Sequence, residues 1–200
     1  MTLLGLTGGV GMGKSVAADF LRGFGLPVVD TDQLARDLVL PGQPALAEIR
    51  SVFGDGVTGA DGELRRDVLA GIVFGDDAQR QRLEHILHPR IRAAWSEQVR
   101  AWETAGERAG VVVIPLLFET GAQTAFTATI CVACSAASQA ERLAARGWSA
   151  GEAERRIRAQ WPTERKLASA EFLVWAEGGL DQTRQQLERI LRTLGLAQPP

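Results

Sequence analysis

Residues 5–15 read GLTGGVGMGKS, and this stretch decides the fold. Residues 8–15 fit the pattern G-x-x-x-x-G-K-[ST], and they stand between a short apolar run and a helical pattern, as a phosphate-binding loop requires. Glycines permit positive φ angles and close approach of the backbone, so that successive N–H groups turn toward an anion. The helix that follows adds the positive end of its dipole. The stretch therefore predicts that the chain binds a nucleoside triphosphate.

The loop also supplies two side chains for phosphate chemistry. We expect Lys14 to reach the β- and γ-phosphates and Ser15 to ligate Mg²⁺ through its hydroxyl group. Lys14 and Lys166 are the only lysines among 22 basic residues, which argues against a stray surface charge inside the loop. The chain has no asparagine for a guanine-reading N-K-x-D motif, which favours ATP. The residues predicted to bind ATP in the loop are Gly9, Gly11, Met12, Gly13, Lys14, Ser15 and Val16.

Length and composition are those of one globular domain. The chain has 200 residues, of which 46% are hydrophobic and 23% are charged, and this excludes a disordered or fibrous protein. The net charge of −2 argues against a nucleic-acid or anionic-membrane binder. No window reaches the ~18 apolar residues of a membrane span, and no charged region precedes the first apolar run as in a secretory signal. We therefore expect a cytoplasmic protein, a monomer or a weak homo-oligomer.

Strand-like and helical patterns alternate along the chain. This alternation predicts an α/β fold in which a parallel P-loop sheet is covered by helices on both faces. The expected strands are 2–6, 27–30, 110–117, 127–133 and 171–175. The expected helices are 14–24, 43–53, 65–74, 76–87, 89–104 and 181–194, with a turn-rich loop at 54–62. Residues 198–200 are expected to fray.

Two helical stretches exceed what crossover connections need. Between the second and third strands lie almost only helical patterns, which predict a helical subdomain built on the sheet, with a helix junction at the pair His88-Pro89. The second stretch, 138–168, is helical and rich in arginine. Within it Arg142 and Arg146 are spaced i,i+4, and such a pair repels unless it meets anions such as phosphates. Nearby glutamates also allow a mutually paired surface.

Two aspartates stand where the second strand ends. In the stretch VVDTD, Asp30 and Asp32 share one face if the strand persists, at the carboxyl edge where open parallel sheets bind ligands. An aspartate there accepts a proton from an attacking hydroxyl group or helps to hold Mg²⁺. In the alternative interpretation, Asp30 or Thr31 caps the helix that follows. Capping needs only one residue, so this alternative leaves Asp32 without a structural role. We therefore interpret Asp32 as the functional carboxylate.

Three further features of the sequence bear on its function. VVVIPLLFE at 111–119 predicts a buried strand that Pro115 ends, leaving an apolar wall of Leu116, Leu117 and Phe118. The pair Cys131 and Cys134 reads C-x-x-C, but residues three apart in a strand face opposite ways and no second cysteine pair exists, so we reject a redox or zinc site. His85 and His88 lack the carboxylates that would complete a metal site.

Several motifs, in this order, resemble those of the dephospho-CoA kinase family. They are GLTGGVGMGKS, VVDTDQLARDLV followed by PG, LRRDVLAGIVF, LHP and VVVIPLLFE, and the resemblance runs from residue 3 to about residue 170. It implies a P-loop kinase domain over 1–200, a helical substrate subdomain at 55–95 and a lid at 138–166. The implied reaction takes ATP, with Mg²⁺, and 3′-dephospho-CoA to ADP and CoA.

The resemblance also implies roles for single residues. Asp32, Lys14 and Arg142 take catalytic positions, Arg142 also handles ATP, and Ser15 with Asp32 holds the metal. Gln160 and Lys166 match the return segment of the lid. The implied substrate-binding residues are Thr7, Asp32, Arg36, Arg66, His88, Leu116, Leu117 and Glu119. One departure is the stretch AEFLVWAEGG at 170–179, which lacks the asparagine that the family uses near the nucleotide base.

Three alternative functions remain from the residues alone. Shikimate kinases share the phosphate loop and the D-x-D pair, but they carry a G-G-G run that is absent here. A nucleoside-monophosphate kinase fits the same fold. An ATP-dependent switch without acceptor chemistry would bind ATP and have no need of Asp32.

Overall fold

The structure is a computed structural model that describes residues 1–196. The chain divides into two compact units, of which the first comprises residues 1–30 and continues from residue 101, and the second comprises residues 31–100. Each unit has its own hydrophobic core. The second unit contains the whole stretch 55–95 and extends beyond it at both ends. The expected fraying of 198–200 lies outside the described residues.

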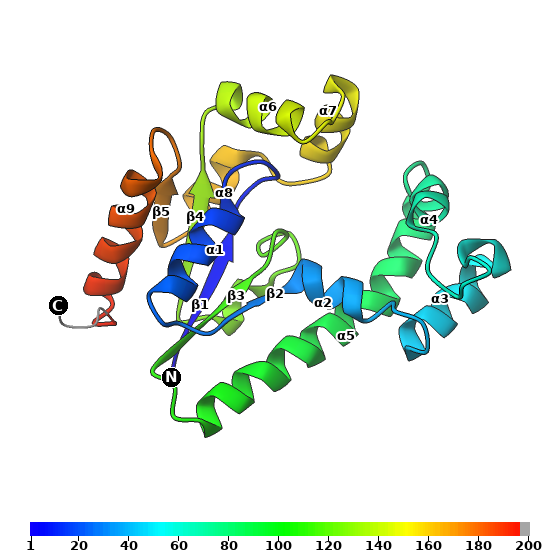
Figure 1. The fold of residues 1–200 in the computed structure, drawn as a ribbon, viewed down its shortest axis with the longest axis horizontal. Helices are drawn as coiled ribbons and strands as arrows, with labels where there is room; N and C mark the ends of the chain where they lie inside the picture. The colour runs from blue at the N-terminus through cyan, green and yellow to red at the C-terminus, as the bar shows by residue number, and fades with distance from the viewer. Residues whose placement is uncertain (197–200) are drawn as a thin grey trace. The chain divides into compact units, whose positions relative to one another are not determined.

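A parallel sheet of five strands forms the centre of the first unit, as the alternating pattern predicted (Figure 1). The strand order is β2-β3-β1-β4-β5, so β1 is the central strand and delivers the glycine-rich loop to the middle of the carboxyl edge. The strands are β1 (Thr2–Thr7), β2 (Val28–Asp30), β3 (Ala109–Val113), β4 (Ala128–Ala133) and β5 (Phe172–Trp175).

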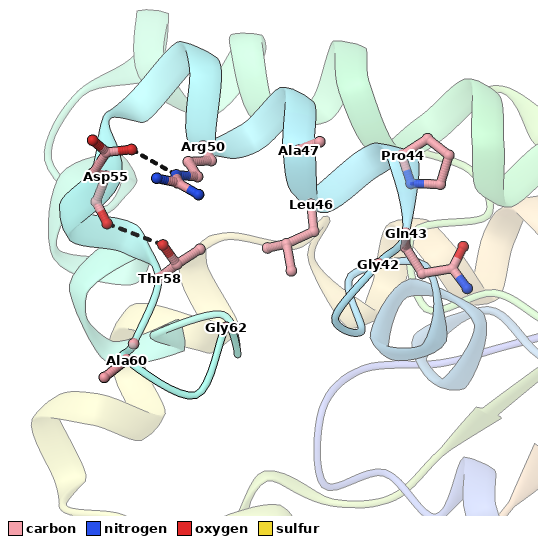
Figure 2. Close-up of a pocket in the computed structure, with 11 residues that line it drawn as sticks. Gly42, Gln43, Pro44, Leu46, Ala47, Arg50, Asp55, Thr58, Ala60 and Gly62 are labelled. Atoms are coloured by element: carbon pink, nitrogen blue, oxygen red, sulfur yellow. Dashed lines mark hydrogen bonds and ion pairs between the residues drawn. The ribbon is translucent and has the colours of Figure 1, made fainter.

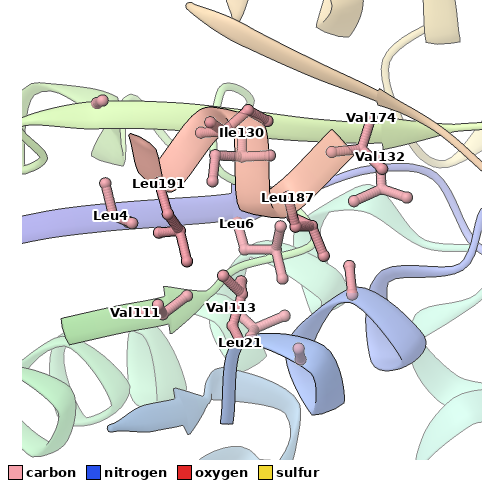
Figure 3. Packing of buried hydrophobic residues seen from close by; sticks show 14 of the residues in the cluster. Leu4, Leu6, Leu21, Val111, Val113, Ile130, Val132, Val174, Leu187 and Leu191 are labelled. Carbon is pink, nitrogen blue, oxygen red and sulfur yellow. The ribbon is translucent and has the colours of Figure 1, made fainter. Parts of the chain in front are cut away.

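Helices cover both faces of this sheet, which explains the continuous burial of β3 and β4. On one face α1 (Lys14–Gly23) and α9 (Leu180–Thr193) pack on alternate strand residues, with Leu21 and Leu187 fully buried (Figure 3). On the other face the end of α5 contributes Trp102, whose ring would stand only 2.4 Å from a Cβ at Gly110. The glycine in β3 is therefore required by the close approach of this ring.

The chain between β3 and β5 departs in detail from the sequence expectation. β3 ends at Val113, before Pro115, so the strand is shorter than the expected 110–117, because proline cannot donate to the ladder. A short 3-10 helix, η2 (Ala122–Ala125), precedes β4. The arginine-rich stretch is helical as predicted, and it forms α6 (Ala136–Ala145), α7 (Ala150–Arg158) and α8 (Thr163–Ser169).

The second unit is helical, as its sequence predicted. A core of buried apolar residues, among them Ile49, Val57 and Ile86, joins its elements. The stretch 54–62 is more ordered than the expected loop, since it contains a 3-10 helix and its Thr58 forms an antiparallel bridge with Leu64, just beyond it. The elements are α2 (Thr31–Asp37), α3 (Pro44–Phe53), η1 (Asp55–Val57), α4 (Arg66–Val73) and α5 (Asp77–Thr104), whose last residues belong to the first unit.

The expected helix junction at His88-Pro89 is wrong, because α5 runs through Pro89 as one helix of 28 residues. A proline inside a helix removes one backbone donor and disturbs the carbonyl groups before it. The side chain of Arg90 donates to the carbonyl oxygen of Ile86 at 2.7 Å and also pairs with Glu48. This donor binds the carbonyl group next to that of His85, the group that loses its helical N–H partner at Pro89. No helix within residues 1–196 is long and apolar enough to cross a membrane, and this includes α5.

Cys131 and Cys134 are both free and buried. Burial raises the pKa of the Cys131 thiol to about 11, and burial also raises the pKa of Cys134. Since the thiolate is the reactive form, we expect neither residue to react with iodoacetamide at pH 8 in the folded protein, and both to react after unfolding. Mass spectrometry after timed labelling measures this, and rapid labelling of either cysteine in the native state would contradict the assignment.

Candidate active site

The glycine-rich loop joins the end of β1 at Thr7 to the start of α1 at Lys14. Gly8, Gly11 and Gly13 have φ angles of 149°, 75° and 97°, which residues with a side chain rarely adopt. Within the described residues no side chain caps the N-terminus of α1. The first N–H groups of the helix therefore point, with the helix dipole, at the space enclosed by the loop, which is the geometry of an anion site.

Lys14 folds back across this loop. Its Nζ donates to the carbonyl oxygens of Gly8 at 2.8 Å and Gly9 at 2.9 Å. Two fixed acceptors hold the ammonium group inside the loop rather than in solvent. The positive charge thus lies against the curve of backbone where phosphate oxygens bind in such loops. Ser15 and Val16 follow in the first turn of α1 and are exposed.

A substitution at Gly8 tests this loop geometry most directly. A Cβ on Gly8 would stand 2.2 Å from the carbonyl oxygen of Val132 in β4, and its φ is unfavourable for any side chain. We expect Gly8→Ala to displace the loop and abolish detectable ATP binding by calorimetry. Gly23→Ala is the matched control, because a Cβ there meets nothing within 4 Å and should leave ATP affinity unchanged. Normal ATP binding by Gly8→Ala would show that the loop is not the nucleotide site.

Arg142 in α6 lies beside the end of the loop. Its Nη2 donates to the carbonyl oxygen of Ala176 at 2.6 Å, and a Cβ on Gly13 would stand 3.5 Å from its Nη1. Nη1 is buried and has no hydrogen-bond partner within the described residues. A buried guanidinium nitrogen is costly without an acceptor, so this site fits an anion near Gly13. Arg146, its expected companion, is exposed at the end of α6.

Glu177 lies in the stretch 170–179, which differs from the family pattern, and its side chain connects this stretch to α6. It was not identified from the sequence alone. The hydroxyl group and backbone N–H of Ser135, and the hydroxyl group of Ser138, hydrogen-bond its carboxylate and lower the pKa of Glu177. The carboxylate thereby fixes the start of the helix that carries Arg142. No signal near Glu177 identifies its partners, which lie about forty residues earlier in the chain.

A buried ion pair lies behind the loop. The Nζ of Lys166, whose side chain is 1% exposed, lies 2.7 Å from Oε1 of Glu119 and donates to the carbonyl oxygen of Pro115 at 2.6 Å. The same Glu119 oxygen accepts from the backbone N–H of Trp161. Thr7 donates its hydroxyl group to Pro115 as well. The pair therefore ties the end of β3 to α8 and to the segment before it.

The three residues of the predicted apolar wall differ in how deeply they are buried. Leu116 is half-buried, whereas Leu117 is fully buried, and a Cβ on Gly5 would touch it at 3.2 Å. The side chain of Leu117 therefore contributes packing rather than accessible surface. Phe118 is buried as well and stacks on Trp161, with ring centres 6.4 Å apart.

The other predicted site residues belong to the second unit. Asp32 lies in the first turn of α2, because β2 ends at Asp30 as the expected strand 27–30 did, so the condition under which the two aspartates would share a strand face is not met. The rule that strand residues two apart share a face does not apply to this pair. Arg36 in the last turn of α2, Arg66 at the start of α4 and His88 in α5 are all exposed. The side chain of Glu119, by contrast, is engaged within the first unit.

The second unit contains a pocket of about 630 Å³ between α3 and the loop that follows it (Figure 2). Arg50 and Asp55 form an ion pair at 2.5 Å at its border. Leu46 and Pro44 supply apolar surface, and Gly59 and Gly62 also line the pocket. None of the predicted substrate-binding residues lines this pocket, so it lies apart from the predicted acceptor residues within this unit.

Known proteins resemble this chain along nearly its whole length. The family model described as dephospho-CoA kinase matches residues 2–182. A protein of Shouchella clausii named dephospho-CoA kinase is 40% identical over 185 residues, which are 92% of this chain and 94% of that protein. The crystal structure of TT1252 from Thermus thermophilus has a TM-score of 0.85 and 34% identity, covering 96% of this chain and 97% of the other. A dephospho-CoA kinase from Campylobacter jejuni superposes with a TM-score of 0.71 at 24% identity, covering 96% of each chain.

Proposed function

The chain belongs to the dephospho-CoA kinase family, and on this premise we propose that it transfers the γ-phosphoryl group of ATP to the ribose 3′-hydroxyl group of dephospho-CoA. The observation that carries the proposal is an intact phosphate loop in a chain that matches the family model over residues 2–182. The enzyme is accordingly a P-loop kinase with a small-molecule acceptor, active in the synthesis of coenzyme A. ATP is available in the cytoplasm, which is the location that we propose.

In the proposed reaction the 3′-oxygen of the ribose attacks the γ-phosphorus atom. A new P–O bond forms, the bond to the oxygen that bridges the β- and γ-phosphorus atoms breaks, and ADP leaves. Asp32 accepts the proton of the attacking hydroxyl group as its oxygen becomes nucleophilic. Lys14 and Arg142 supply positive charge to the transferring phosphoryl group, and this matters because such transfer depends mainly on positioning and electrostatic stabilisation.

A magnesium ion fits the oxygen donors that the chain offers. Mg²⁺ prefers oxygen ligands and is held by one or two protein groups together with substrate phosphates. The hydroxyl group of Ser15, exposed in the first turn of α1, is such a donor, and the carboxylate of Asp32 is a second. We propose these two residues as its ligands. When bound, the ion neutralises charge on the β- and γ-phosphate oxygens.

We propose that the remaining predicted residues bind the acceptor. Arg36 and Arg66 are exposed guanidinium groups, suited to the pyrophosphate of dephospho-CoA, which carries two negative charges. His88 is exposed on α5 and offers a further donor. The proposed set is Asp32, Arg36, Arg66, His88, Leu116 and Glu119, whereas Thr7 and Leu117, both fully buried, contribute a hydrogen bond to Pro115 and packing, respectively. We propose a monomer or a weak homo-oligomer as the active form.

ADP formation from Mg·ATP tests the proposal directly. We expect turnover with 3′-dephospho-CoA and none above background with shikimate, AMP, CMP or no acceptor. Turnover with another of these acceptors would keep the chain a P-loop kinase and overturn the proposed substrate. ATP binding with no acceptor-dependent ADP would favour the ATP switch instead.

A further inference from the structure

Both backbone polar groups of Val10 are bound by glutamine side chains. Val10 donates its N–H to Oε1 of Gln160 at 3.0 Å, and Nε2 of Gln139 donates to the carbonyl oxygen of Val10 at 2.7 Å. Val10 stands in the phosphate loop between two glycines. Gln139 lies in α6, and Gln160 follows α7 by two residues. Two segments more than 120 residues further along the chain thus hold one residue of the loop, through the two peptide groups on either side of its Cα atom.

The two glutamines meet opposite chemical demands. The Val10 N–H can only donate, so it requires the amide oxygen of Gln160, and the Val10 carbonyl can only accept, so it requires the amide nitrogen of Gln139. Glycine on each side of Val10 leaves the backbone free to take many conformations. The side-chain amides hold the Val10 backbone in place before phosphate binds. They therefore reduce the conformational entropy that the loop has to lose on binding.

Both glutamines stand on anchored segments. Gln139 is 7% exposed and lies one helical turn before Arg142. The residue after Gln160 is Trp161, whose N–H donates to Glu119 and whose ring stacks on Phe118. The position of the Val10 backbone is therefore coupled to α6 through its carbonyl group and to the segment that leads out of α7 through its N–H group.

We propose that Gln139 and Gln160 are positioning residues that hold the phosphate loop ready for ATP. Neither residue contacts the reacting atoms in this proposal. Each acts through its hydrogen bond to the backbone of Val10. The inference deepens the proposed function, because it names residues that set nucleotide affinity in the same kinase. Its main readout, the Kd for ATP, is measured without an acceptor, so its failure and that of the proposed reaction are distinguishable.

The first experiment removes each hydrogen bond with little change in volume. We expect Gln160→Met and Gln139→Met to raise the Kd for ATP about tenfold by calorimetry, since each leaves a polar backbone group without its partner. The KM for dephospho-CoA should change less than twofold. Gln98→Met, at an exposed glutamine of α5, is the control and should have no effect. Unchanged ATP affinity in both loop variants, or an equal rise of both constants, would overturn the proposal.

The second experiment tests the direction of each hydrogen bond. A glutamate accepts but does not donate when ionised, so Gln160→Glu keeps its bond from Val10 while Gln139→Glu loses its own. Both variants add the same negative charge, so we expect ATP affinity to fall further in Gln139→Glu. Hydrogen exchange of the Val10 amide should be faster in Gln160→Met than in Gln160→Glu. Equal ATP affinities in the two glutamate variants, or equal exchange rates, would show that the hydrogen bonds do not position the loop.

Discussion

Replacing Asp32 by asparagine is expected to lower the rate of phosphoryl transfer by about 10²- to 10⁴-fold, the range of a lost general base. The amide has almost the same size as the carboxylate, but it cannot take the proton of the acceptor hydroxyl group and is a poorer ligand for Mg²⁺. ATP affinity should change little, because the phosphate loop is untouched. Steady-state formation of CoA and calorimetry with ATP measure the two quantities separately.

Asp37→Asn is the control for this variant. Asp37 lies in the same short helix, is exposed, and accepts a hydrogen bond from Gln33, so it shares the chemistry of Asp32 without the proposed role. We expect it to keep a normal rate. Near-normal transfer by Asp32→Asn would remove Asp32 from the reaction, whereas equal losses in both variants would point to damage of α2.

The second large effect is expected on stability, from Lys166→Met. The variant leaves Glu119 as a buried carboxylate without its counter-ion and removes a donor from the Pro115 carbonyl. Breaking a buried ion pair from one side typically destabilises by about 3–5 kcal/mol. For a chain of this length that corresponds to a fall in Tm of roughly 10 °C, measured by calorimetric or fluorescence melting.

Two further variants show whether the loss is electrostatic. The double variant Glu119→Leu with Lys166→Met removes both charges, and we expect it to melt above Lys166→Met alone, since apolar pairs often replace buried ion pairs well. Arg158→Met breaks an exposed pair with Glu154 and should shift Tm by no more than about 2 °C. A double variant no more stable than Lys166→Met would mean that packing, not charge, holds this region.

The features of the fold that depend on residues close together in the chain could be predicted from the sequence alone. The loop of residues 8–15, the five strands and most helix bounds follow from glycine spacing, apolar runs and periodicity, each of which acts over a few residues. Pro115 likewise indicated that the third strand ends early, because its missing N–H is a local property, although β3 stops at Val113 and not at the expected residue 117. The motif order also identified the family, which the comparisons show.

One expectation failed where tertiary contacts overrode a local preference. Pro89 predicted a helix end, but α5 runs through it, and Ile86, three residues earlier, packs in the core of the second unit. Asp32 is a different case, because the expected strand ended at Asp30, as observed, and only a longer strand would have put both carboxylates on one face. A helix begins at Thr31 instead, in line with the alternative that Asp30 or Thr31 caps a helix.

The sequence by itself determined the fold class, the phosphate loop and the family of this protein, because these are carried by spacing along the chain. Only the tertiary structure decided how the loop is supported. Lys166 was notable for its rarity, but its partner Glu119 is 47 residues away, and the glutamines that hold Val10 are still more distant. Such contacts depend on how strands and helices pack, since hydrogen bonds form between atoms that folding brings within about 3 Å, whatever their separation in sequence.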